Sequence, residues 1–141
     1  MSERIDIAIN IAAAGWGDAV PHAEAVVRRA ATAAIGAGGE AATASTTVEI
    51  SILLADDAEL RRLNLAWRDR DEATNVLSFP ADDAIEGAPP HGGPRLLGDV
   101  ALALETVMEE AARDGKSPAD HLAHLVVHGV LPLLGHDHLD D

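Results

Sequence analysis

Two segments of alternating hydrophobicity, with a helical pattern between them, constrain this chain more than any other feature of its sequence. Isoleucines occupy every second position from 5 to 11, and apolar residues do so again from 48 to 54. A period of two is typical of strands that bury one face. Between them, after a Gly-Trp-Gly break at 15–17, apolar residues recur at three- and four-residue spacing from 26 to 35. A strand, a helix and a second strand in succession favour a parallel pair joined by a crossover.

The remaining elements are predicted from the residues that begin or end them. Asp56, followed three residues later by a glutamate, is a capping pattern that begins a second helix. Residues 75–79 predict a short third strand that Pro80 ends, and residues 96–104 predict a fourth strand. A short helix then reaches Gly115, and Ser117 with a proline after it begins the last helix.

The length of 141 residues suits one domain, so we expect residues 1–141 to fold as a single unit. Residues 81–94 include six that are proline or glycine, and we expect a mobile loop there. The chain has three aromatic residues, which are Trp16, Trp67 and Phe79. The core should therefore be aliphatic, and a surface of aromatic rings for stacking nucleic-acid bases is nearly excluded.

The charge of the chain is strongly negative, with 10 lysines and arginines against 24 aspartates and glutamates and a net charge of −14. This balance argues against nonspecific binding of nucleic acid and against DNA as a partner. Salt screens charges beyond about 8 Å, however, so the four arginines between 61 and 70 can still hold RNA locally. No secretory signal and no apolar run of membrane-spanning length is found, so we expect a cytoplasmic protein without a membrane partner.

Histidines are concentrated late in the chain, where five of the seven lie between 121 and 138. On a helix, His121, His124 and His128 would line one face, and Gly135 offers a point where the chain turns back. Such clusters bind transition metals, and the absence of cysteine leaves His, Asp and Glu as the available ligands. A zinc protease is excluded, because its helix needs a glutamate directly after the first histidine of an i, i+4 pair, and here Leu125 follows His124 and Gly129 follows His128.

The residues from 128 to 138, His-Gly-Val-Leu-Pro-Leu-Leu-Gly-His-Asp-His, resemble the signature of the YbeY family of ribosomal RNA maturation endoribonucleases. Residues 63–68 with 74–80, and the Leu-Gly-Asp-Val segment at 97–100, agree with that family in order and position. The resemblance implies an α+β fold with one mixed, mostly parallel four-stranded sheet. Helices flank this sheet, and the C-terminal helix carries the histidines.

The same resemblance implies a metal-dependent endoribonuclease that cleaves single-stranded RNA. Members of the family act in ribosomal RNA maturation, notably at the 3′ end of the small-subunit RNA, and in ribosome quality control. The expected partners are therefore single-stranded ribosomal RNA and the ribosome or small-subunit assembly factors. A zinc ion held by three histidines is implied, and the attacking group is either water or the 2′-hydroxyl of the substrate.

The residues of that site can be carried onto this chain position by position. The first and third zinc ligands are His128 and His138, and the position of the second is Pro132. Arg68 matches the basic residue that faces the RNA. The resemblance therefore makes Arg68 and His128 the expected catalytic residues, with Arg68 also binding substrate.

Pro132 departs from the family with two physical consequences. Proline supplies no donor atom for a metal, so a replacement ligand would have to be His124, His136 or Asp137. Proline also removes a backbone N–H and biases Leu131 out of the helical region, so the helix should kink or stop near 131. If the metal is lost, the chain would be an RNA-binding assembly factor that keeps the fold. A metallohydrolase acting on another substrate is a further alternative, against which the arginines speak.

Overall fold

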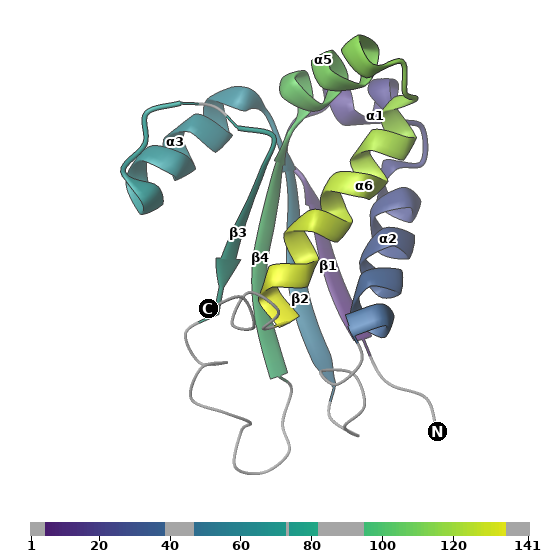
Figure 1. Cartoon of the computed structure of the whole chain (residues 1–141), viewed down its shortest axis with the longest axis vertical. Helices are drawn as coiled ribbons and strands as arrows, with labels where there is room; N and C mark the ends of the chain where they lie inside the picture. Colours follow the sequence, from purple (N-terminus) through teal and green to yellow (C-terminus); the bar gives the residue numbers. More distant parts are fainter. Residues whose placement is uncertain (1–4, 39–46, 73, 82–94, 135–141) are drawn as a thin grey trace.

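The described strands form one mixed sheet in the order β1-β2-β4-β3. The computed structural model describes residues 5–38, 47–72, 74–81 and 95–134 (Figure 1). The strands are β1 (Ile5–Ile11), β2 (Val48–Ala55), β3 (Val76–Pro80) and β4 (Arg95–Ala103). β1, β2 and β4 are parallel neighbours, whereas β3 pairs antiparallel with β4 at the edge. The α+β fold with a mostly parallel four-stranded sheet is therefore confirmed.

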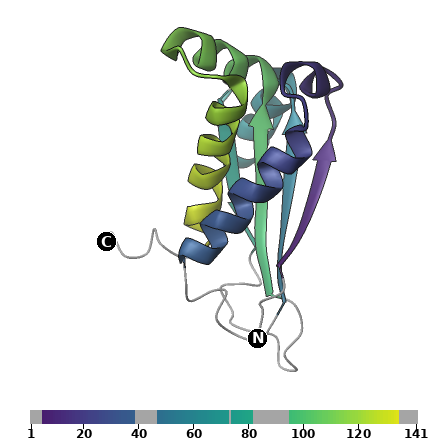
Figure 2. The same cartoon turned by 90° about the vertical axis from the view of Figure 1, so that its right-hand side faces the viewer.

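The helices are distributed unequally over the two faces of this sheet. They are α1 (Gly15–Ala19), α2 (Ala23–Gly38), α3 (Asp57–Arg68), α5 (Leu104–Asp114) and α6 (Pro118–Val130), with a 3₁₀ turn η2 (Leu131–Leu134) after α6. Figure 2 shows α2 and α6 side by side over one face. Of the described helices, α3 alone lies over the opposite face, near β3 and β4. Part of that second face is consequently covered by none of the described helices.

The alternation along β2 explains which face holds the core. Val48, Ile50, Ile52 and Leu54 are at most 1% exposed and pack toward α2 and α6. The residues between them point to the other face, where a smaller cluster forms around Leu60 and Leu77. Because successive side chains of a strand point to opposite faces, one sequence pattern sets both layers.

The predicted helix boundaries are confirmed by their caps. The Asp56 carboxylate accepts a hydrogen bond from the Glu59 N–H at 2.9 Å, and the Ser117 hydroxyl accepts one from the Asp120 N–H at 3.1 Å. Gly115 ends α5 in the left-handed conformation. Side-chain oxygens at these positions satisfy backbone donors that have no partner inside the helix.

The break predicted at residues 15–17 is wrong, because these residues begin the short helix α1. Trp16 is fully buried, and its indole N–H donates to the Ala55 carbonyl at 2.8 Å. Tertiary packing of one large side chain thus holds a helical turn that glycine disfavours locally.

Two further predictions concern membrane-spanning segments and the loop at 81–94. Within the described residues, no helix combines the length and apolar character that crossing a bilayer requires. The loop predicted at 81–94 lies outside the described residues from position 82 onward.

Candidate functional site

The edge strand β3 holds two expected site elements together through one serine. The Ser78 carbonyl accepts a hydrogen bond from Arg68 Nη2 at 2.5 Å, and the Ser78 hydroxyl donates to the Gly129 carbonyl at 2.7 Å. Arg68 is the last residue of α3, and Gly129 directly follows His128 in α6. Ser78 therefore connects the arginine on one side of the strand with the histidine-bearing helix on the other.

The contact with α6 depends on the missing side chain at position 129. A Cβ there would lie 2.7 Å from Val100 Cγ1 and 3.1 Å from Val76 Cγ2. Glycine thus lets the helix backbone approach β3 and β4 closely enough for the Ser78 hydrogen bond.

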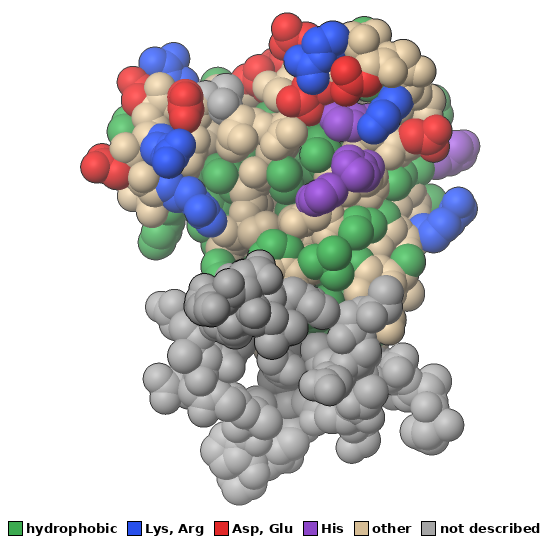
Figure 3. Space-filling model, in the orientation of Figure 1, with side chains coloured by type: hydrophobic (Ala, Val, Ile, Leu, Met, Phe, Trp, Pro, Cys, Tyr) green, Lys and Arg blue, Asp and Glu red, His purple; other side chains and the backbone are tan. Residues whose placement is uncertain are grey.

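The histidines of α6 line one cavity of about 440 Å³. The rings of His124 and His128 are both exposed, with centroids 4.3 Å apart and planes inclined by 69°. Figure 3 shows the histidine side chains gathered on this surface, beside lysine, arginine and acidic side chains. His121 lines the same cavity, so the predicted histidine face is confirmed for all three positions.

His121 is nevertheless occupied by a hydrogen bond within the protein. It is 6% exposed, and its Nε2 lies 2.8 Å from Glu110 Oε1 in α5. Glu110 also accepts a hydrogen bond from Asn75 Nδ2 at 3.1 Å. This partly buried cluster ties α5, α6 and the residue before β3 together, so we assign His121 a structural role beside the exposed His124 and His128.

The charge of Glu110 is stabilised by these partners. Burial by itself would raise the pKa of Glu110, but the hydrogen bonds from His121 and Asn75 and the charges of His121 and Arg113 outweigh it. The pKa of Glu110 therefore lies below its ordinary value, and the carboxylate is ionised at neutral pH.

Replacing Glu110 with glutamine should destabilise the protein at neutral pH. Glutamine removes the charge that both donors favour, and we expect a loss of about 2 kcal/mol in the free energy of unfolding. The pKa of Glu110 is lower in the folded state than in the unfolded state. The stability that the Glu110 charge contributes is therefore complete above the ordinary pKa of 4.5 and is lost as the pH falls through the folded-state pKa. Urea unfolding of wild type and Glu110→Gln between pH 7 and pH 3 measures the difference.

Glu109→Gln provides the matched control for that experiment, because Glu109 is an exposed neighbour on the same helix. We expect it to change stability by less than about 0.5 kcal/mol. A Glu110→Gln deficit that stays constant on acidification would contradict the assignment.

The exposed pair of histidines has the chemistry of metal ligands. Desolvation by the neighbouring side chains, together with the charges of His128, Lys116 and His121, lowers the pKa of the otherwise exposed His124 below its ordinary value. A neutral imidazole keeps the lone pair that binds a metal. His124 and His128 also have the i, i+4 spacing with which helices present two histidines to zinc.

The structure describes only one of the other positions at which a metal ligand was expected. Pro132 lies in η2 and offers no donor atom, and His136, Asp137 and His138 lie outside the described residues. In the part of the chain that is described, no three metal-ligating side chains converge. The described residues thus bring two imidazoles, His124 and His128, side by side without forming a complete metal site.

The predicted end of the last helix is confirmed, but its expected mechanism is wrong. α6 ends at Val130 and continues as the 3₁₀ turn. Leu131, however, keeps helical dihedral angles of −56° and −43°, and its N–H still donates to the Val127 carbonyl. The missing N–H belongs to Pro132, so the chain tightens after Leu131 while Leu131 itself stays helical.

The four arginines between 61 and 70 do not act as one basic cluster. Three of them pair with carboxylates: Arg61 with Asp71 at 2.6 Å, Arg62 with Glu59, and Arg70 with Glu72 at 3.6 Å. Among the described residues, Arg68 alone of the four is held by a backbone carbonyl instead. Its remaining N–H groups are available for a phosphate, which a guanidinium binds with two parallel hydrogen bonds.

The fold and the site together define a class of protein. A small α+β domain places a guanidinium and a histidine-bearing helix on either side of its edge strand, which is an arrangement suited to binding a phosphate and a metal. A family model described as "Endoribonuclease YbeY" matches residues 18–141. The chain belongs to the YbeY family of endoribonucleases.

Individual relatives agree with this assignment. An "Endoribonuclease YbeY" from Paramagnetospirillum magneticum is 50% identical over 141 residues, which cover 100% of this chain and 84% of the relative. One from Rhodospirillum rubrum is 51% identical over 140 residues, covering 97% of this chain and 70% of the relative. The solution structure of TM1509 from Thermotoga maritima has a TM-score of 0.55 at 20% identity, covers 91% of this chain and 71% of that one, and supports the fold alone.

Proposed function

We propose that this chain is a single-strand-specific, zinc-dependent endoribonuclease that matures ribosomal RNA at the 3′ end of the small-subunit RNA and takes part in ribosome quality control in the cytoplasm. Its partners would be single-stranded ribosomal RNA and the ribosome or small-subunit assembly factors. The family and the names of relatives that are about 50% identical support the ribonuclease activity. The substrate, the zinc ion and the compartment are inferred from the resemblance.

The observation that carries the proposal is the double hydrogen bonding of Ser78. Through this residue, Arg68 and the segment that carries His128 share one support. A phosphodiester placed at the outer edge of β3 would meet a cation from α3 and imidazoles from α6. Positioning of this kind supplies much of the rate enhancement in phosphoryl chemistry.

Each residue is given one role in this proposal. Arg68 neutralises the phosphate by donating to its oxygens. His128, with His138 and with His124 as the candidate replacement at Pro132, would hold the zinc ion. A zinc ion polarises a phosphoryl oxygen or lowers the pKa of a bound water. Ser78 positions Arg68 and helix α6 without touching the substrate.

Removing the His128 imidazole should abolish cleavage. A partner in the outer shell of a metal site is worth 10- to 100-fold, so loss of a direct ligand should lower the cleavage rate at least about a hundredfold. The assay compares wild type and His128→Ala on a labelled single-stranded RNA that carries the 3′ end of the small-subunit RNA, with the same RNA in a duplex as the uncut control. Cleavage by His128→Ala at the wild-type rate would refute its role.

The same RNA tests Arg68 through salt dependence. Arg68→Ala should weaken binding and lower the slope of log affinity against log salt by about one, because one phosphate contact is lost. Arg29→Ala is the matched control, since Arg29 is exposed on α2 and its loss changes the net charge equally. Equal slopes for the two variants would show that Arg68 acts only through the overall charge.

A specific observation also favours an RNA-binding assembly factor that does not cleave. Pro132 removes one expected metal ligand, and among the described residues no three metal-ligating side chains converge. RNA binding by the wild type without cleavage at any zinc concentration would support this alternative. Cleavage that a chelator stops and zinc restores would support the nuclease.

A further inference from the structure

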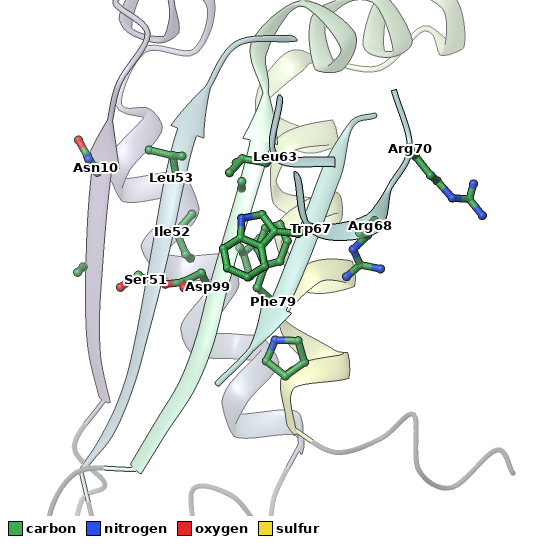
Figure 4. Close-up of a pocket in the computed structure, with 14 residues that line it drawn as sticks. Asn10, Ser51, Ile52, Leu53, Leu63, Trp67, Arg68, Arg70, Phe79 and Asp99 are labelled. Atoms are coloured by element: carbon green, nitrogen blue, oxygen red, sulfur yellow. The ribbon is translucent and has the colours of Figure 1, made fainter. Parts of the chain in front are cut away.

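The sheet face that α2 and α6 leave uncovered contains an open groove of about 1030 Å³. The sheet residues that line it include small and polar side chains, among them Ala8, Asn10, Ser51 and Asp99. Figure 4 shows Asn10 and Leu53 on one side of this groove and Arg68 and Arg70 on the other, with Trp67 above the sheet. Small residues keep the floor low, so the groove can admit a flat ring.

Trp67 stands over this groove with little protein around it. Its side chain is 71% exposed, although burying a residue of this size is strongly favourable. The other tryptophan of the chain, Trp16, is fully buried. Leu63 and Phe79 line the same groove, and a contiguous exposed apolar patch of this kind marks an interaction surface.

The Trp67 indole contacts Phe79, and Arg68 in turn lies over the Phe79 ring. The rings of Trp67 and Phe79 lie 6.3 Å apart between centroids and are inclined by 60°, which is an edge-to-face pair. Arg68 Cζ lies 5.7 Å from the centroid of the Phe79 ring. The edge-to-face contact covers one of the four ring faces and the Arg68 guanidinium lies over another, so faces remain for a further ring. Although the scarcity of aromatic residues predicts against a stacking surface, two of the three lie together here.

The charges around the groove determine which part of a nucleotide can enter. The carboxylate of Asp99 lies on the floor, whereas the positive side chains, Arg68 and Arg70, lie at one side. A phosphate on the floor would face a carboxylate, but an uncharged base would not. A strand would therefore keep its backbone at the arginines and turn a base inward.

We propose that Trp67 and Phe79 form a stacking site for one unpaired base of RNA, with the adjoining phosphate at Arg68. The ligand is the single-stranded RNA of the proposed function, and the inference rests on that function to this extent. Duplex RNA would bind poorly, because its bases are already stacked on one another. Stacking offers each base a similar π-face, so we expect little preference among the four bases.

The test uses fluorescence and a base-free probe. Because Trp16 is buried, acrylamide quenching reports on Trp67. The full chain is titrated in EDTA with single-stranded oligoadenylate of about ten nucleotides, and with an abasic oligonucleotide of equal length. The oligoadenylate should quench Trp67 and protect it from acrylamide, whereas the abasic oligonucleotide should bind without either effect.

A set of variants separates stacking from simple apolar contact. Trp67→Leu should weaken oligoadenylate binding about tenfold and leave abasic binding unchanged, because one stacked base is lost. Trp67→Tyr should restore most of the affinity. Leu65→Ala is the matched control, since Leu65 is a 47% exposed apolar residue of the same helix that does not line the groove.

The outcomes that overturn the stacking site differ from those that overturn the nuclease. Equal affinity of wild type and Trp67→Leu for oligoadenylate would refute stacking. If Trp67→Leu instead abolished self-association of the protein and left RNA binding unchanged, the groove would be a contact between two copies of the chain, and stacking would again be refuted. Trp67-dependent binding in EDTA without cleavage in zinc would leave stacking in place and refute the nuclease instead.

Discussion

Replacing Pro132 with histidine is expected to raise zinc affinity by about a hundredfold or more. The wild type should bind zinc weakly at micromolar concentration, because proline supplies no donor at this position. Since Leu131 keeps helical angles, a histidine at 132 would lie one turn after His128. An outer-shell partner alone is worth 10- to 100-fold in metal affinity, so a direct ligand should be worth at least the upper figure. Zinc titration by calorimetry measures the change.

The gain should appear in thermal stability only when zinc is present. A ligand bound by the folded state alone stabilises it by about 2.7 kcal/mol at one hundred times its dissociation constant. Pro132→Ala is the matched control, because it restores the backbone N–H to the helix without adding an imidazole. Both variants should gain stability in EDTA, whereas only Pro132→His should gain more on addition of zinc.

The ligands used by the wild type follow from the same measurements. Full zinc occupancy of the wild type that His124→Ala abolishes would place the metal one turn earlier, between His124 and His128. If the wild type and Pro132→His bound zinc equally and His124→Ala had no effect, His136 or Asp137 would be left as the replacement ligand. This result would refute both a zinc site weakened by Pro132 and a zinc site moved to His124.

Local patterns predicted most of this fold because they describe local physics. Alternating hydrophobicity predicted the strands, and capping residues such as Asp56 and Ser117 predicted the helix starts. Both kinds of pattern depend only on residues that are neighbours in the sequence. α1 was missed for the opposite reason. Its Trp16 is held by the Ala55 carbonyl, 39 residues away, and no neighbouring residue reveals that partner.

The site was predicted in its residue types and less well in its contacts. The resemblance supplied Arg68 and His128, but the role of Ser78 depends on β3 being an edge strand with α6 on one side. Similarly, His121 was grouped with its exposed neighbours because helical spacing cannot show that Glu110 of another helix lies 2.8 Å away. A polar serine between the apolar residues Leu77 and Phe79 was the one signal that could have drawn attention to Ser78.

Replacing Gly98 with alanine should destabilise the fold more than any exposed substitution. Gly98 follows an irregularity in the pairing of β2 with β4 and has a φ of +139°. A Cβ there would lie 2.3 Å from the Phe79 carbonyl oxygen, which belongs to the backbone of β3 and cannot rotate away. Backbone strain of about 1–3 kcal/mol and a similar overlap cost give about 4 kcal/mol in all. Thermal unfolding should show a midpoint about 10 °C lower or more.

Gly115→Ala separates the overlap from the strain in that prediction. Gly115 also has a positive φ, of +69°, but a Cβ there would meet nothing within 4 Å. Its replacement should cost about 1 kcal/mol, the ordinary penalty for a left-handed alanine. Because Gly98 lies against the strand that carries Ser78 and Phe79, its variant should also lose affinity for single-stranded RNA while still folded, and the Gly115 variant should not. Equal destabilisation by the two substitutions would show that β3 moves aside freely, and the edge strand would then not be the rigid support that the site requires.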